Sequence, residues 1–271
     1  MDNANILPAF LLTLFAGLST GIGGAIAFFT KKTNKNFLSV ALGFSAGVMI
    51  YISFVEILPK AIESLSGEYS QRTGTWIGII AFFAGILMTA LIDKAIPTFE
   101  NPHEVRTVEQ VNEAVDETLK NSKLLRTGIF MALAVAFHNF PEGFATFMAT
   151  MKDPALGIGI AVAVAIHNIP EGIAVSVPIY HATGSRKKAF LYSFLSGLAE
   201  PVGAIIGFLL LSQFMNDTMF GIVFALIGGI MVFISFDQLL PTAREYGRHH
   251  LSIMGLVGGM AVMAVSLVLF M

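Results

Sequence analysis

The sequence predicts an all-α integral membrane protein with eight membrane-spanning helices. Hydrophobic residues make up 55% of the 271 residues and charged residues only 13%, whereas a soluble domain carries roughly 25% charged residues. Mean hydropathy is +0.75, and a helix needs about 20 apolar residues to cross a bilayer. With so few charges the chain cannot cover a water-facing surface, so a lipid bilayer is its expected environment.

Eight apolar windows, separated by polar or charged breaks, give the expected spans. In chain order they are residues 6–30, 38–59, 75–97, 125–150, 156–180, 188–213, 218–241 and 250–270. The only long break in the sequence is 98–124, which is acidic and is expected to be a solvated loop. Its valines have loose helical spacing, so a short amphipathic helix is the alternative. We expect a single transmembrane domain over 1–271.

The distribution of positive charge predicts how the chain is oriented. Of the 16 lysines and arginines, 13 lie in the connections after the first, third, fifth and seventh spans. The opposite side holds only Lys60, Arg72 and Lys152. Because cytoplasmic connections are enriched in lysine and arginine, both termini are expected to face outward. The long loop is then cytoplasmic.

Composition also excludes several classes of function. The net charge of −2 argues against a nucleic-acid partner, which requires a basic face. The chain has no cysteine, so it has neither disulfides nor thiolate metal sites. No G-x-x-x-x-G-K-[ST] phosphate-binding loop is present, which argues against ATP-driven pumping by this polypeptide alone.

Two pairs of segments resemble each other and lie on spans that cross in opposite directions. GVMIYISFVEILPKA at 47–61 matches GIMVFISFDQLLPTA at 229–243, and AFHNFPEGF at 136–144 matches AIHNIPEGI at 165–173. Such inverted pairs are expected from a pseudo-two-fold axis in the membrane plane. Inverted repeats with helices interrupted by proline or glycine are typical of transporters.

The second pair places ionisable groups near the centre of the bilayer. His138, Glu142, His167 and Glu171 fall in the middle of their spans, as does Glu200 in SGLAEPVGA. A charge at this depth costs roughly 2.5–3.5 kcal/mol even on the most lenient scale. A divalent cation offsets this cost directly, since carboxylate and imidazole are its ligands.

The spacing of the motif residues supports a metal site. The histidine and the glutamate of each motif are four residues apart and share one helix face, whereas Asn139 and Asn168 are turned by about 100° and can serve a second, neighbouring ion. Pro141 and Pro170 leave the carbonyl four residues back without its usual donor. The predicted metal ligands are His138, Asn139, Glu142, His167, Asn168, Glu171 and Glu200.

Further polar residues suggest a pathway on either side of this site. Glu56 lies toward the outer end of the second span, and its repeat counterpart Gln238 lies beside Asp237 toward the inner end of the seventh. An acidic mouth and a polar exit would suit cation import; hydrogen bonding at the helix ends is the alternative. Met49 and Ser53 precede Glu56 by one and two turns, where core packing is the simpler interpretation.

The segments HNFPEG, HNIPEG, SGLAE and FVEILP together resemble the ZIP family of divalent metal transporters, in its bacterial ZupT-type branch. The resemblance covers essentially the whole chain. It implies uptake of Zn²⁺, and also of Fe²⁺, Mn²⁺, Co²⁺ or Cd²⁺, across the cytoplasmic membrane of a prokaryote. It further implies a 3+2+3 arrangement of inverted repeats and a homodimer. One departure is that the loop after the third span, histidine-rich in many relatives, offers only His103.

The resemblance also implies a binuclear site, with residues assigned by motif. One metal position uses His138, Glu142, His167 and Glu171, and the other uses Asn139, Glu142, Asn168, Glu171 and Glu200.

Two other functions use the same ligands. An intramembrane di-metal carboxylate enzyme would also place glutamates and histidines inside a helical bundle, although it needs neither inverted repeats nor interrupted helices. The HNFPE segment differs from the H-E-x-x-H protease motif, because its second position is an asparagine that cannot act as a base. A selective channel is the other alternative, and flux measurements distinguish it from a carrier.

Overall fold

The computed structural model of the chain describes residues 3–29, 35–95, 117–211, 214, 216–246 and 249–269, and within these ranges every regular element is a helix. After a short 3-10 turn, Asn3–Asn5, the elements are α1 Ile6–Phe29, α2 Lys35–Ile52, η2 Ser53–Ile57, α3 Leu58–Glu68, α4 Gln71–Ala95, α6 Glu117–Lys152, α7 Pro154–Thr183, α8 Arg186–Gly197, α9 Ala199–Leu211, α10 Asp217–Ile234, η4 Ser235–Leu239, α11 Leu240–Tyr246 and α12 His249–Leu269.

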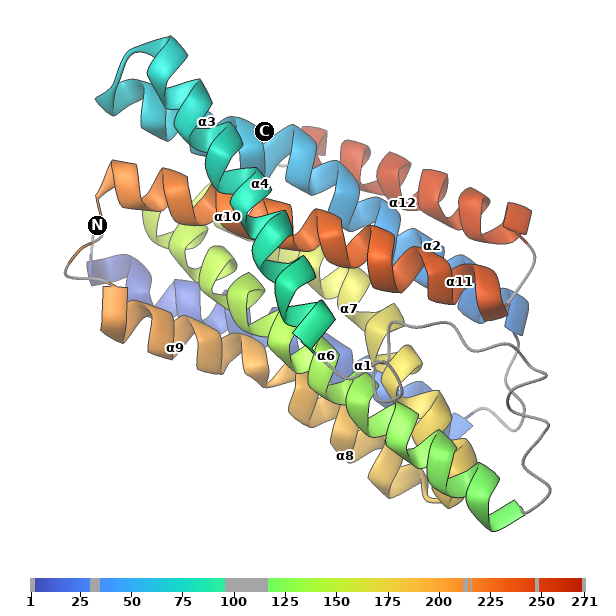
Figure 1. Cartoon of the computed structure of the whole chain (residues 1–271). Coiled ribbons are helices and arrows are strands. Elements are labelled where there is room, and N and C mark those ends of the chain that lie inside the picture. The colour runs from blue at the N-terminus through green and yellow to red at the C-terminus, as the bar shows by residue number, and fades with distance from the viewer. Residues whose placement is uncertain are drawn as a thin grey trace.

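Long apolar helices make up nearly the whole described chain. Within the described ranges, seven helical segments are long and apolar enough to cross a membrane, and α6, with 36 residues, is a further long helix that contains HNFPEG. The start of α1 and the end of α12 lie toward the same end of the bundle, and α6 and α8 begin at the opposite end (Figure 1). The predicted all-α membrane fold is confirmed, whereas outward termini and the 3+2+3 arrangement stay predictions.

The helices exceed the predicted spans most at the end of the second span and at the start of the fourth. The second span continues through η2 into α3 as far as Glu68. Helix α6 begins at Glu117, so the last residues of the predicted loop 98–124 are helical, and 98–116 lie outside the described residues.

Capping residues set both ends of α7. Asp153 precedes α7 and its Oδ1 accepts the N–H of Ala155 at 2.9 Å, while Pro154 occupies the first helical position. This is the usual place for a proline, whose missing N–H has no partner there anyway. Gly184, with φ of 64°, ends α7 in the left-handed region, which glycine adopts readily. The tight turn at Asp153 makes α6 and α7 antiparallel neighbours.

The first predicted repeat has the same backbone irregularity in both copies. Each of η2 and η4 is one π-helical turn, followed by Pro59 and Pro241 respectively. Proline lacks an N–H and its ring clashes with the carbonyl four residues back, and one inserted residue relieves this clash. Ser53 Oγ donates to Met49 O, and Ser235 Oγ donates to Met231 O, both at 2.7 Å. The sequence repeat is therefore also a repeat of local structure.

Glycines in matched positions bring the outer helices into close contact. A Cβ atom at Gly47 of α2 would lie 2.0 Å from Leu256 O of α12, and one at Gly229 of α10 would lie 2.0 Å from Phe82 O of α4. Gly47 and Gly229 are equivalent in the repeat, so α2 packs on α12 as α10 packs on α4. Only glycine permits such backbone contact, which Cα–H···O interactions support.

The structure reveals a third correspondence, between AGLSTGIG at 16–23 in α1 and SGLAEPVG at 196–203 in α8 and α9. A Cβ at Gly23 would lie 2.0 Å from Ile169 O, and one at Gly203 would lie 2.0 Å from Phe140 O. Ile169 and Phe140 occupy the same position in the two HN-x-PEG motifs. Thus α1 packs on α7 as α9 packs on α6, which supports the predicted inverted arrangement.

The helix contacts define two groups. The α7 group comprises α1, α6, α7, α8 and α9, and the α10 group comprises α2, α3, α4, α10, α11 and α12 (Figure 1). Lys152 at the end of α6 links them, since its Nζ donates to Ser64 Oγ at 2.7 Å and to Asp217 Oδ1 at 2.9 Å. The same Nζ lies 4.3 Å from the centroid of the Phe220 ring. This contact lies on the predicted outer side.

Candidate metal site

The polar side chains predicted near the bilayer centre are all brought inside the α7 group. Each of the seven predicted ligands is at most 4% exposed. They come from three places in the fold: His138, Asn139 and Glu142 from α6, His167, Asn168 and Glu171 from α7, and Glu200 from α9. The antiparallel crossing of α6 and α7 therefore brings the polar residues of the two motifs together.

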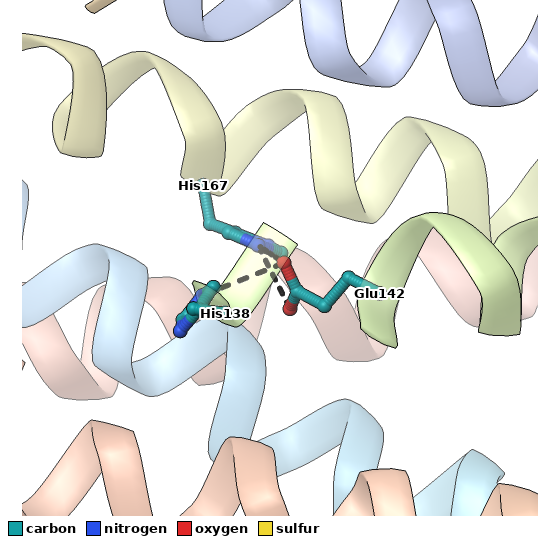
Figure 2. A group of neighbouring side chains, drawn as sticks. All are labelled: His138, Glu142 and His167. Carbon is teal, nitrogen blue, oxygen red and sulfur yellow. Dashed lines mark hydrogen bonds and ion pairs between the residues drawn. The ribbon is translucent and has the colours of Figure 1, made fainter. Parts of the chain in front are cut away.

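Each histidine faces a glutamate of the other helix. His138 Nε2 lies 3.3 Å from Glu171 Oε1 and 3.4 Å from Glu142 Oε2. His167 Nε2 lies 3.4 Å from Glu142 Oε1. Figure 2 shows His167 reaching from α7 toward the His138 and Glu142 side chains of α6. One ligand atom from each of these three residues lies within 4.8 Å of the others, a spacing that one ion can bridge.

The second nitrogen of His167 determines how that ring binds. His167 Nδ1 lies 3.1 Å from Ala163 O, and a carbonyl oxygen only accepts, so Nδ1 carries the proton and donates. In the neutral ring the lone pair is then on Nε2, which faces Glu142. A backbone carbonyl that fixes the tautomer in this way is the usual support of a metal-binding histidine.

The asparagines are anchored through their NH₂ groups. Asn139 Nδ2 donates to Ser196 O at 3.2 Å. Asn168 Nδ2 donates to Ala16 O at 3.0 Å and to Glu200 Oε1. Among the described residues, the Oδ1 atoms of both asparagines and Oε2 of Glu200 have no hydrogen-bond donor. These oxygens are buried acceptors that a cation would satisfy.

The site has an excess of negative charge. Glu142, Glu171 and Glu200 are at most 2% exposed, and within the described part of the chain no lysine or arginine pairs with them. A buried charge without a partner is strongly destabilising. Imidazole nitrogen and carboxylate oxygen suit zinc, iron and manganese, so the residues present fit a divalent cation.

Ser45 of α2 is a site residue that the sequence analysis missed. Its hydroxyl lies 3.3 Å from His167 O and 3.5 Å from Glu171 Oε1, and the side chain is fully buried. Ser45 thus brings a hydroxyl group of the α10 group to the site. A buried serine among apolar residues gives no signal in the sequence, because serine is common in membrane helices.

A cavity adjoins the site on the side that the charge distribution predicts to be cytoplasmic. Its lining residues are Leu42, Met131, Val135, His138, Glu171, Ala174, Gln238, Leu239 and Thr242. Gln238 Nε2 donates to Met131 Sδ at 3.0 Å across this cavity. The cavity therefore extends from the His138 and Glu171 side chains to the Gln238–Met131 contact, which joins the two helix groups.

The remaining predicted pathway residues lie outside the cavity lining. Met49 is part of the apolar core, and the Ser53 hydroxyl is bonded within its own helix. Glu56 and Asp237 are half-buried on η2 and η4. Of the five predicted pathway residues, Gln238 is the one that this cavity contacts.

Residues 4–267 match the family model described as ZIP Zinc transporter. Three bacterial proteins named Zinc transporter ZupT are similar over nearly their whole length. The protein from Clostridium perfringens is 60% identical, covering 99% of this chain and 98% of that protein. That from Lysinibacillus sphaericus is 62% identical over 98% and 99%, and that from Nitratidesulfovibrio vulgaris is 58% identical over the full length of both.

Proposed function

The chain belongs to the ZIP family of zinc transporters, and from this premise we propose that it carries Zn²⁺ inward through the site between α6 and α7. As a member of this family it is a multi-pass protein of the cytoplasmic membrane of a prokaryote, and it is a divalent metal transporter rather than an enzyme. The di-metal enzyme considered above is therefore set aside.

The observation that carries the proposal is that the two HN-x-PEG motifs meet inside one helix group. We assign one metal position to His138, Glu142, His167 and Glu171, because His138 contacts both glutamates and His167 contacts Glu142. We assign a neighbouring position to Asn139, Asn168 and Glu200, whose unpaired oxygens point to a cation. Glu142 and Glu171 would be shared between the two positions.

We propose that the ion leaves the site through the cavity beside His138 and Glu171. Gln238 lies on this route and would offer an amide oxygen once its contact with Met131 is broken. Glu56 and Asp237 are proposed as polar groups near the two ends of the path. A membrane potential favours inward movement by about 2.3 kcal/mol per charge per 100 mV.

The ligands also allow other ions. Carboxylate, amide and imidazole groups without thiolates bind Fe²⁺, Mn²⁺, Co²⁺ and Cd²⁺ as well as Zn²⁺, and we propose that these ions compete for transport. The competition is measured directly by adding each ion in excess to a zinc uptake assay.

We favour a carrier over a channel, because the proposed ligands are at most 4% exposed, so the helices around them must move before an ion can enter or leave. Saturable uptake and counterflow are expected of a carrier. The family resemblance also leads us to propose a homodimer in the bilayer, which light scattering of the purified protein tests.

The central experiment is ⁶⁵Zn²⁺ uptake into liposomes that contain the purified protein. Wild type is compared with Glu142→Ala and Glu171→Ala, and with Glu68→Ala as an exposed control on α3. We expect wild type and Glu68→Ala to accumulate zinc and the two site variants, if folded, to lose uptake. Normal uptake by folded Glu142→Ala and Glu171→Ala would rule out this site.

A further inference from the structure

The internal repeat makes Thr20 of α1 the counterpart of Glu200 of α9. A Cβ at Gly172 would lie 2.0 Å from Thr20 O, and a Cβ at Gly143 would lie 2.1 Å from Glu200 O. Gly143 and Gly172 are equivalent glycines of the two HN-x-PEG motifs. Thr20 therefore has the same backbone relation to α7 that Glu200 has to α6.

The side chains of Thr20 and Glu200 also flank one helix crossing. A Cβ at Gly17 would lie 3.3 Å from Glu200 Cβ, and a Cβ at Gly197 would lie 2.8 Å from Thr20 Cβ and 3.0 Å from its Oγ1. Gly17 and Gly197 are themselves equivalent in the repeat. Both side chains thus lie where α1 crosses α8 and α9.

The two motif asparagines complete this correspondence. Asn168 donates to Ala16 O and contacts Glu200, and Asn139 donates to Ser196 O. Ala16 and Ser196 are equivalent, each four residues before Thr20 or Glu200. The same relation predicts that the Thr20 side chain lies on the Asn139 side of the site.

The Thr20 hydroxyl is buried without a bond to its own helix, as is the Thr146 hydroxyl of α6. It is fully buried, and Oγ1 has no hydrogen-bond partner among the described residues. The carbonyl four residues back, Ala16 O, already accepts from Asn168 Nδ2 and from Ser19 Oγ. By contrast, the Thr13 hydroxyl in the same helix donates to Ala9 O at 2.9 Å. Buried hydroxyls are nearly always bonded, so an unpaired one points to a ligand.

We propose that Thr20 is a further metal-binding residue, whose hydroxyl holds a water molecule that the transported divalent ion keeps at the position of Asn139, Asn168 and Glu200. The inference rests on the proposed function. The threonine side chain is two carbon atoms shorter than glutamate, so water is needed to bridge the remaining distance. Water-mediated contacts of this kind bind nearly as well as direct ones.

A hydroxyl in place of a fourth carboxylate also limits the charge of the site. The three buried glutamates already exceed the charge of one divalent ion. A neutral group at Thr20 orients the hydrated ion without adding a negative charge that would hold it more tightly. Thr20 therefore contributes to affinity in a way that still permits release.

Equilibrium zinc binding and zinc uptake by the full-length protein test this role. Thr20→Val keeps the shape of the side chain and removes its hydroxyl, and Thr20→Ser keeps the hydroxyl. Loss of one hydrogen bond predicts zinc affinity about three- to tenfold weaker for Thr20→Val. Thr20→Ser and the control Thr13→Val should bind zinc as wild type does. Equal zinc affinity of Thr20→Val and wild type overturns the proposal.

A double-mutant cycle with Glu200→Gln separates metal binding from packing. If both side chains act on one ion, Thr20→Val should weaken zinc binding by less than about twofold in the Glu200→Gln background. The effects of the two substitutions on the thermal unfolding of the metal-free protein should instead add. An equal loss of affinity in both backgrounds would refute the shared ion. A wild-type protein that neither binds nor transports zinc overturns the proposed function and, with it, this inference.

Discussion

The two histidines of the site are held differently, although their motifs are nearly identical. His167 is fixed by its Nδ1 donation to Ala163 O, so its Nε2 is positioned before any ion arrives. His138 instead lies between the carboxylates of Glu142 and Glu171 and also lines the cavity. We therefore propose that His167 holds the ion and that His138 lies on the side from which the ion leaves.

Replacing His167 should therefore impair binding strongly. A bond to a charged group contributes about 1.5–3 kcal/mol, so His167→Ala should weaken zinc binding roughly 10- to 100-fold. His250→Ala, which changes an exposed histidine, is the matched control. Isothermal titration of the two purified variants measures both affinities, and equal affinity for zinc would contradict the role of His167.

At the scale of single residues, the ionisable side chains of the site could be predicted from the sequence, whereas its hydroxyl side chains could not. His138, Glu142 and Glu200 are conspicuous because ionisable groups are rare in apolar segments. Ser45 and Thr20 gave no such signal, since hydroxyl side chains in helices ordinarily bond to their own backbone. Only the tertiary contacts distinguish these two from Thr13, whose hydroxyl does bond in this way.

At the scale of the elements, the spans were predictable but their irregularities were not. Apolar windows located each helix, yet η2 and η4 depend on how the backbone accommodates Pro59 and Pro241. The pattern of apolar residues contains no information on such a turn. The polar residues 117–124 belong to the predicted loop, but glutamate, lysine and leucine in this segment have high helix propensity.

Adjacent glycines of α12 provide a test of the helix packing. A Cβ at Gly259 would lie 2.1 Å from Phe44 O, whereas a Cβ at Gly258 would meet nothing within 4 Å. Overpacking predicts that Gly259→Ala lowers the free energy of unfolding by about 1–3 kcal/mol. Gly258→Ala should be neutral or stabilising by up to about 1 kcal/mol, since alanine favours the helix.

Thermal unfolding in detergent measures both changes. A Gly259→Ala protein as stable as Gly258→Ala would show that α2 and α12 do not pack as closely as described.

At the scale of the whole molecule, the two helix groups contact each other through polar side chains at three depths. Lys152 contacts Ser64 and Asp217 on the predicted outer side. Ser45 contacts the site itself, and Gln238 contacts Met131 on the predicted inner side. Any movement of one group past the other must exchange these contacts.

The predicted orientation can be tested because the chain contains no cysteine. Ser70→Cys, between α3 and α4, should react with a membrane-impermeant maleimide added to intact cells. Ser185→Cys, between α7 and α8, should react only after the cells are permeabilised. The opposite labelling pattern would show that the termini face the cytoplasm.

The sequence predicted two of the three repeat pairs of the molecule. The pair in α6 and α7 shares five of six motif residues, whereas the 16–23 and 196–203 segments share only Gly17, Leu18 and Gly23 with their counterparts. In apolar helices, so few identical residues are not by themselves evidence of a repeat. Their equivalence became evident only through the matched contacts of Gly23 and Gly203.

The most direct test of the account is zinc K-edge X-ray absorption of the purified protein loaded with one zinc ion per chain. If both motifs bind the same ion, the spectrum will show two imidazole nitrogens together with carboxylate oxygens, at about 2.0–2.2 Å. His138→Ala and His167→Ala should each lose one imidazole. A wild-type spectrum without imidazole, or one unchanged in both variants, would contradict the claim that the two motifs form a single metal site.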